Sequence, residues 1–196
     1  MKNKVVFMGT PEIAAVYLES LINSKHNIVG VFSQPPRKKD RGMITKNSPV
    51  HLLAKKNEIK IYTPINFNSD NTIKDLEKLQ PDLIIVMGYG LKLPSNILNM
   101  PKMGCINIHV SLLPRWRGAS PIEHSLLNGD QYTGVTIFKL INEMDAGPII
   151  TQETVLIDDK INKGELTKKL NLIGTKLLNS VLPKIYNQEI NLIIQD

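Results

Sequence analysis

Two polar side chains that can do chemistry together, Asn107 and His109, stand two positions apart in a short apolar run at 105–109. Such a run is expected to form a strand, in which side chains two positions apart point to the same face. An amide can donate a hydrogen bond to developing negative charge, and an imidazole can exchange a proton near neutral pH. The alternative is that both side chains merely satisfy nearby backbone groups, because burying them without partners is costly.

A carboxylate can reach the same place from further along the chain. Asp145 lies in a Met-Asp-Ala-Gly-Pro turn at 144–148, which can bring its side chain back to the same sheet edge. The stretch 111–121 follows His109 and combines breakers, two arginines and the only tryptophan. Ligands bind beyond the carboxyl ends of strands in open α/β sheets, so the candidate site spans 88–90, 107–118 and 143–148.

The elements that must position these residues alternate along the chain. An apolar run at 5–8 leads into a helix to about residue 24, with Thr10 as the expected N-cap and Pro11 at the first helical position. A second run at 28–32 completes a strand–helix–strand unit, which implies parallel strands. We predict further strands at 60–62, 83–87, 105–109, 132–140 and 149–157, and helices at 48–56, 71–79 (capped by Asn71 or Thr72), 94–98, 120–128 and 163–185.

Two local patterns refine this order of elements. Ser120 and Glu123 have the spacing of a capping box at the start of a helix. The stretch 33–47 is polar, basic and rich in breakers, so we expect a long mobile loop. The fold class is α/β, with a doubly wound, mostly parallel sheet and late strands that add antiparallel pairing.

Composition narrows the class of protein. With 196 residues, 42% of them apolar, the chain suits a globular domain and not a disordered or fibrous one. No apolar run approaches the roughly 18–20 residues of a spanning helix, and the single cysteine, Cys105, permits no disulfide within the chain. We therefore expect a cytoplasmic protein without a membrane partner. Neither Gly-x-Gly-x-x-Gly nor a phosphate-binding loop motif occurs, which argues against dinucleotide or ATP binding.

The charge balance favours anionic partners without identifying one. There are 24 basic and 18 acidic residues, and part of the excess is local. The clustered cations are Arg37, Lys38, Lys39, Arg41 and Lys46, with Arg115 and Arg117 as a second group. The alternative is a solvated loop with scattered surface charge.

The stretch Cys-Ile-Asn-Ile-His-Val-Ser-Leu-Leu-Pro-Arg-Trp-Arg-Gly-Ala at 105–119 resembles the signature of the folate-dependent formyltransferases, and most closely of those that act on methionyl-tRNA. Further segments match in the same order: Phe-Met-Gly-Thr-Pro-Glu at 7–12, the 34–49 loop with Arg-Gly at 41–42, Gly-Tyr-Gly-Leu at 88–91, Thr-Gly-Val-Thr at 133–136, and the 144–148 turn. The resemblance covers essentially the whole chain.

The resemblance implies an enzyme that moves the formyl group of 10-formyltetrahydrofolate to the amino group of initiator methionyl-tRNA, with no metal. Asn107, His109 and Asp145 are then its catalytic residues. Amine attack creates an oxyanion and a cationic nitrogen, so Asn107 can donate to the oxyanion. His109 can exchange a proton, and Asp145 can orient the imidazole or take the amine's proton. Which of these two accepts the proton first stays open.

The same resemblance implies binding residues. The folate site comprises Met87, Gly88, Tyr89, Gly90 and Leu91 together with Ser111, Leu112, Leu113 and Pro114. The tRNA site comprises Arg37, Lys38, Lys39, Arg41, Arg115 and Arg117. Simpler roles stay open: Tyr89 as core, Leu112 and Leu113 as loop anchors, Trp116 as a lid or a packed anchor, and Cys105 as packing.

The sequence departs from the family in two places. The second, β-barrel domain of the family is expected to be absent, with a catalytic domain at 1–188 and the start of a linker or tail at 189–196. Met43-Ile44 replaces the basic pair expected after Arg41-Gly42, which weakens the case for tRNA capture. We expect a monomer. The alternatives are a formyltransferase acting on glycinamide ribonucleotide or an amino-sugar nucleotide, and a non-catalytic folate- or RNA-binding module.

Overall fold

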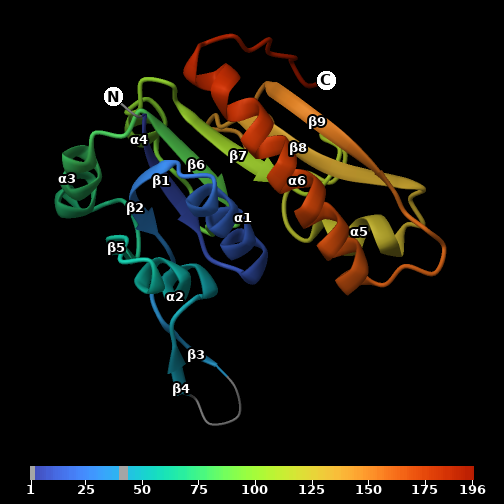
Figure 1. Cartoon of the computed structure of the whole chain (residues 1–196), viewed down its shortest axis with the longest axis horizontal. Coiled ribbons are helices and arrows are strands. Elements are labelled where there is room, and N and C mark those ends of the chain that lie inside the picture. The colour runs from blue at the N-terminus through green and yellow to red at the C-terminus, as the bar shows by residue number, and fades with distance from the viewer. Residues whose placement is uncertain (1–2, 40–43) are drawn as a thin grey trace. The chain divides into compact units, whose positions relative to one another are not determined.

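Strand β1 (Lys4–Gly9) leads into helix α1 (Glu12–Asn23), and β2 (Asn27–Phe32) then pairs with β1 in parallel. The strand–helix–strand unit predicted from the sequence is therefore confirmed. The computed structural model describes residues 3–39 and 44–196. The chain divides into two compact units, Met1–Cys105 and Ile106–Asp196 (Figure 1).

Four parallel strands form the frame of the first unit. β1 pairs with β2 and with β6 (Leu83–Met87), and β5 (Ile61–Tyr62) pairs with β2. Every residue of β6 is buried, as its unbroken apolar run predicts, because strands of a parallel sheet are covered on both faces. The helices of this unit are α1, α2 (Pro49–Lys56), α3 (Asp70–Leu79) and α4 (Ser95–Leu98).

The helix starts in this unit agree with the sequence predictions at α2 and differ from them at α1 and α3. Ser48 caps α2 and accepts a hydrogen bond from His51 N at 3.0 Å, with Pro49 at the first position, as expected. Ser69 caps α3 in place of Asn71 or Thr72. The prediction for Thr10 is wrong: Pro11 holds the cap position of α1, and the Thr10 hydroxyl donates to Tyr89 O at 2.9 Å. The Thr10 oxygen, which would have to accept from the helix in order to cap it, accepts instead from Gln34 N at 3.3 Å.

The basic stretch after β2 contains more regular structure than its composition suggests. β3 (Arg37–Lys39) and β4 (Ile44–Lys46) pair antiparallel, and Figure 1 shows them as a separate ribbon extending past α2. The stretch predicted as a long loop at 33–47 therefore contains two short paired strands. Ile44 and Thr45 favour strand conformation, whereas the breaker-rich residues 40–43 between the strands lie outside the described part of the chain.

The second unit is antiparallel where the first is parallel. β7 (Cys105–His109) pairs with β8 (Tyr132–Lys139), which pairs with β9 (Ile149–Leu156). Helix α6 (Lys163–Tyr186) packs on β8 and β9 and contacts α5 (Pro121–Leu127). The antiparallel pairing predicted for the late strands is confirmed, and with it the α/β class. Within residues 3–39 and 44–196, no helix combines the length and apolar character needed to cross a membrane.

Ser120 does not form the capping box predicted for α5, whereas α6 begins with a capping box that was not predicted. Ser120 adopts a left-handed conformation (φ 55°) and makes no side-chain cap bond to α5, while Glu123 pairs with Lys163 at 2.7 Å. The capping box lies instead at α6, where Asn162 and Glu165 exchange hydrogen bonds of 3.0 Å. A side chain cannot accept from the first turn when its own backbone turns away from the helix.

Candidate active site

Asn107 and His109 lie on β7, side chains to one face as the spacing predicts, and His109 stands opposite Thr136 of β8. Both are buried, with 9% and 7% of their surface exposed. Among the described residues, no hydrogen-bond partner of the Asn107 side chain is found. An amide with free donors and acceptors at the end of a strand is suited to a bound molecule. That favours the functional interpretation of Asn107 over backbone satisfaction.

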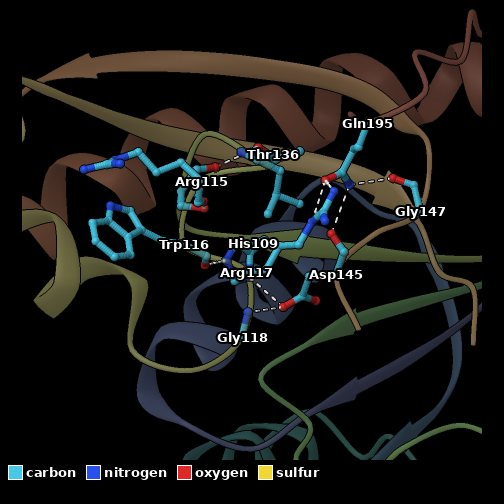
Figure 2. Close-up of polar contacts among 11 residues, drawn as sticks. His109, Arg115, Trp116, Arg117, Gly118, Thr136, Asp145, Gly147 and Gln195 are labelled. Atoms are coloured by element: carbon cyan, nitrogen blue, oxygen red, sulfur yellow. Dashed lines mark hydrogen bonds and ion pairs between the residues drawn. The ribbon is translucent and has the colours of Figure 1, made fainter. Parts of the chain in front are cut away.

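The ring of His109 is fixed by one backbone group and faces one carboxylate. Its Nε2 lies 2.7 Å from Trp116 O, and its Nδ1 lies 3.7 Å from Asp145 Oδ2 (Figure 2). Because a carbonyl oxygen only accepts, Nε2 must carry the proton. A neutral ring then presents its lone pair at Nδ1, so Nδ1 is the nitrogen that can take up a proton beside Asp145.

Asp145 is held by the turn between β8 and β9. Its backbone is left-handed (φ 48°), and its Oδ2 accepts a hydrogen bond from Gly118 N at 2.8 Å. Two residues on, Gly147 packs so closely that an added Cβ would lie 1.7 Å from Lys139 O. Only glycine fits there, and the turn thereby returns the carboxylate to β7. The sequence prediction that this turn brings Asp145 back beside His109 is confirmed.

The segment 111–114 is tied down by side chains of β8 and β9. The Thr136 hydroxyl donates to Ser111 O at 2.7 Å and accepts from Leu113 N at 3.2 Å. Gln152 Nε2 donates to Leu113 O at 2.9 Å and to Thr136 Oγ1 at 2.8 Å. The buried hydroxyl of Ser111 donates to Arg115 O at 2.6 Å. These bonds fix residues 111–114, which we call the 111–114 shelf. They also occupy the hydroxyl of Ser111.

The apolar residues of this shelf differ in their surroundings. Leu113 is buried in a cluster with Phe138 and Ile149, so it anchors the loop. Leu112 is half-buried and lies over Gly134, where an added Cβ would come within 2.5 Å of its Cδ2. Pro114 is exposed and follows a cis peptide bond. Thr136 and Gln152 were not predicted as supports, although Thr136 lies in the Thr-Gly-Val-Thr stretch that carried part of the resemblance.

Trp116 is a packed anchor and not a lid. Its ring stacks on His124 (centroids 5.1 Å apart), and its Nε1 donates to Asp130 Oδ2 at 2.6 Å. The exposed Arg115 lies over the same ring at 4.4 Å and binds both carboxylate oxygens of Asp130. The hydrogen bond from Arg115 holds the pKa of Asp130 below its ordinary value. This packing fixes the backbone carbonyl of Trp116 that holds His109.

The first unit carries the other segment predicted to bind folate. Met87 ends β6 and is buried, and Gly88 and Gly90 have positive φ (53° and 84°) that suit glycine. Tyr89 is 2% exposed, and its ring lies 6.1 Å from that of Phe67. Burial raises the pKa of Tyr89, and its hydroxyl has no partner among the described residues. The ring contact with Phe67 favours the core interpretation of Tyr89, and Leu91, two residues on, is half-buried.

The basic residues predicted to bind tRNA are only partly described. Arg37 is exposed on β3 and donates to Gln34 Oε1 at 2.8 Å. Lys38 and Lys39 belong to strand β3, and Arg41 lies outside the described residues. Arg117 is exposed and donates to Gln195 Oε1. Their role stays a prediction.

Cys105 is a free cysteine in the protein interior. The Cys105 thiol is buried and donates to Ile97 O and Leu98 O, and burial raises its pKa to about 12. A thiol of that kind packs and does not act as a nucleophile. Searched over the described residues, the side chains of His, Cys, Asp and Glu form no group of three that could hold a metal ion.

Comparison with known proteins agrees with this geometry. A family model described as formyl transferase matches residues 2–182. The methionyl-tRNA formyltransferase of Kosmotoga olearia is 45% identical over 193 residues, which is 98% of this chain and 62% of that protein. The enzyme of the same name from Wolbachia sp. subsp. Drosophila simulans is 44% identical, over 94% of this chain and 62% of its own length. The chain thus spans about three fifths of these curated relatives.

Solved structures resemble the fold. Phosphoribosylglycinamide formyltransferase from Bacillus halodurans aligns with a TM-score of 0.78 at 24% identity, over 95% of this chain and 97% of that one. The enzyme of the same name from Anaplasma phagocytophilum gives 0.81 at 21%, over 97% and 90%. At such identities the likeness concerns the fold, and the doubly wound, mostly parallel α/β fold expected from the sequence is confirmed.

Proposed function

Because this chain belongs to the formyl transferase family, we propose that it transfers the formyl group of 10-formyltetrahydrofolate to the amino group of initiator methionyl-tRNA. The observation that carries the proposal is the pairing of His109 Nδ1 with Asp145 beside Asn107 on the same strand face. The identity of 45% to a methionyl-tRNA formyltransferase supports this acceptor.

The His109–Asp145 pair has the geometry for moving the amine's proton. As the acceptor nitrogen bonds to the formyl carbon, that nitrogen must lose a proton, and the leaving folate nitrogen must gain one. Nε2 is occupied by Trp116 O, so the proton passes through Nδ1. Asp145 stabilises the charged ring, and Gly118 N keeps the carboxylate in place. Between the two proton acceptors that the sequence left open, we therefore assign proton uptake to His109 and the orienting, stabilising role to Asp145.

Asn107 is suited to negative charge on the formyl oxygen. Its amide N–H donors have no partner among the described residues, and its position on β7 is fixed by pairing with Phe138 of β8. A donor that is already in place when charge develops does not have to reorganise, and removal of one such donor costs about 100- to 1,000-fold in rate.

The folate would be held by backbone and apolar groups. The 111–114 shelf is braced by Thr136 and Gln152, and its surface residues Leu112 and Pro114 offer apolar contact. In the first unit, Gly88 and Gly90 of the 87–91 segment bring no side chain of their own to the folate. Formyltetrahydrofolate supplies the one carbon that is transferred.

If methionyl-tRNA is the acceptor, the protein must bind tRNA and act where translation begins. Exposed Arg37, Arg115 and Arg117, with Lys38, Lys39 and Arg41, supply positive charge for the tRNA backbone. A cytoplasmic monomer that acts without a metal and takes part in translation initiation completes the proposal. The proposal also takes 1–188 as the catalytic domain and 189–196 as the start of a linker or tail, which is bridged to β9 through Ile193.

An acceptor panel tests this function. The protein is incubated with 10-formyltetrahydrofolate and, separately, methionine-charged initiator tRNA, glycinamide ribonucleotide or an amino-sugar nucleotide, and formyl transfer is followed. We expect transfer to the charged tRNA, weakened steeply by added salt. Transfer to a small amine alone would move the assignment to the alternative acceptors, and absence of transfer to every acceptor would contradict catalysis by this chain.

A further inference from the structure

The side-chain amide of Gln195 uses both of its ends on loops of the candidate active site. Its Nε2 donates to Asp145 O at 3.0 Å and to Gly147 O at 2.6 Å. Its Oε1 accepts from Nε of Arg117 at 3.1 Å and from a terminal nitrogen of the same guanidinium at 2.8 Å (Figure 2). Both amide hydrogens and both lone pairs of the oxygen are thus engaged.

The two loops that Gln195 joins are those that hold the reacting pair. The 145–147 turn carries the Asp145 carboxylate, and the 116–118 loop supplies Trp116 O to His109 and Gly118 N to Asp145. The turn therefore carries the carboxylate, and the 116–118 loop bonds both the carboxylate and the ring. The Gln195 amide joins the two loops without contacting the His109 ring or the Asp145 carboxylate.

Gln195 is itself held by the sheet. Two residues before it, Ile193 forms an isolated antiparallel bridge with Ile149 at the start of β9, with hydrogen bonds of 2.7 and 2.9 Å. Arg117 also donates to Asp196 O at 3.3 Å. The segment after α6 is thus pinned on both sides of Gln195.

We propose that Gln195 is a positioning residue of the formyl-transfer site, a proposal that rests on the function proposed above. Its amide couples the Asp145 turn to the 116–118 loop and so sets the distance between the carboxylate and His109 Nδ1. Gln195 touches neither group's reacting atoms. Its loss therefore changes turnover and the state of the His109 ring more than it changes substrate binding.

The test compares three variants of the full chain. Gln195→Ala removes both sets of bonds, and Gln195→Glu keeps an acceptor for Arg117 but turns an oxygen toward the carbonyls of Asp145 and Gly147. Asn191→Ala, at an exposed position of the same segment, is the matched control. The readouts are kcat and KM for formyl transfer to methionyl-tRNA, thermal stability, and ¹⁵N NMR of the His109 ring nitrogens.

For Gln195→Ala and Gln195→Glu we expect kcat to fall about 10- to 100-fold, as for a small misplacement of reacting groups, with KM little changed. The His109 spectrum should lose its single Nε2–H form in both variants and keep it in Asn191→Ala. Wild-type kcat and an unchanged ring spectrum in folded Gln195→Glu would overturn the proposal while leaving the function intact. If the wild type transferred no formyl group, the function would fail alone, and the ring spectra would still decide the positioning role.

Discussion

Nδ1 of His109 lies 3.7 Å from Oδ2 of Asp145, and backbone groups of a single loop hold both partners. Trp116 O fixes the far side of the ring, and Gly118 N fixes the same carboxylate oxygen. This arrangement gives the ring one proton position that is already taken and one that is available. The pair can therefore accept a proton from an attacking amine without a change of tautomer.

The carboxylate is expected to matter for rate and little for folding. Asp145→Asn removes the charge that stabilises protonated His109, but its amide oxygen can still accept from Gly118 N. We expect kcat to fall about 100-fold or more, while the free energy of unfolding changes by about 1 kcal/mol or less. Steady-state kinetics and urea unfolding measure both. The control is Asp158→Asn, at an exposed position bonded to Lys169; equal losses in the two variants would contradict the assignment.

Thr136 should be needed for the stability of the 111–114 shelf. Its hydroxyl is fully buried and serves Ser111 O, Leu113 N and Gln152. Thr136→Val keeps the volume but leaves buried groups unpaired, which should lower the free energy of unfolding by about 1–3 kcal/mol. Thr136→Ser should retain most of that stability in urea titration. A Val variant as stable as the Ser variant would show that the bonds contribute nothing net.

Gly147 should tolerate no side chain. A Cβ there would lie 1.7 Å from Lys139 O, a backbone atom that cannot move without disturbing β8. Gly147→Ala is expected to destabilise the protein by about 3 kcal/mol or more. Gly129→Ala provides the comparison, since Gly129 has a positive φ of 63° but open space around it. Its cost should be only about 1 kcal/mol. Similar thermal unfolding temperatures for the two variants would contradict the close packing of the turn.

The Arg115–Asp130 pair should produce a stability difference that depends on pH. The Arg115 bond lowers the pKa of Asp130 in the folded protein, so the carboxylate stabilises the fold above its unfolded pKa of about 3.9. That contribution should disappear as the pH falls through the lower, folded-state pKa. Thermal unfolding of the wild type and Asp130→Asn should therefore differ at pH 7 and converge at strongly acidic pH. A difference that grew on acidification would have the wrong sign.

Local sequence patterns predicted the helices and strands well, but the residues that cap the helices less well. The strand run at 83–87 and the Ser48-Pro49 helix start are as predicted, because burial and capping act there through neighbouring residues. Ser120 failed as a cap because its left-handed backbone is set by the loop before α5, which no four-residue spacing reveals. Thr10 failed because its oxygen accepts from Gln34 N, a backbone group that is distant in the sequence, and not from the first turn of α1.

In the candidate active site, too, local pattern predicted some residues and long-range contacts determine others. Strand alternation placed Asn107 and His109 on one face, and the glycine turn returned Asp145 to them. The supports were not predictable, because the bonds of Thr136 and Gln152 depend on register between strands. Gln195 lies in a stretch expected to begin a linker or tail, and only the bridge at Ile193 reveals its place beside Asp145.

Single-turnover formyl transfer from 10-formyltetrahydrofolate to methionine-charged initiator tRNA tests the central claim most directly. The wild type and His109→Ala are compared at saturating protein, so that differences in binding do not obscure the chemical step. We predict transfer by the wild type and a rate at least about 100-fold lower in the variant. Equal rates in the two proteins would contradict proton transfer at His109, and no transfer by the folded wild type would contradict the proposed function itself.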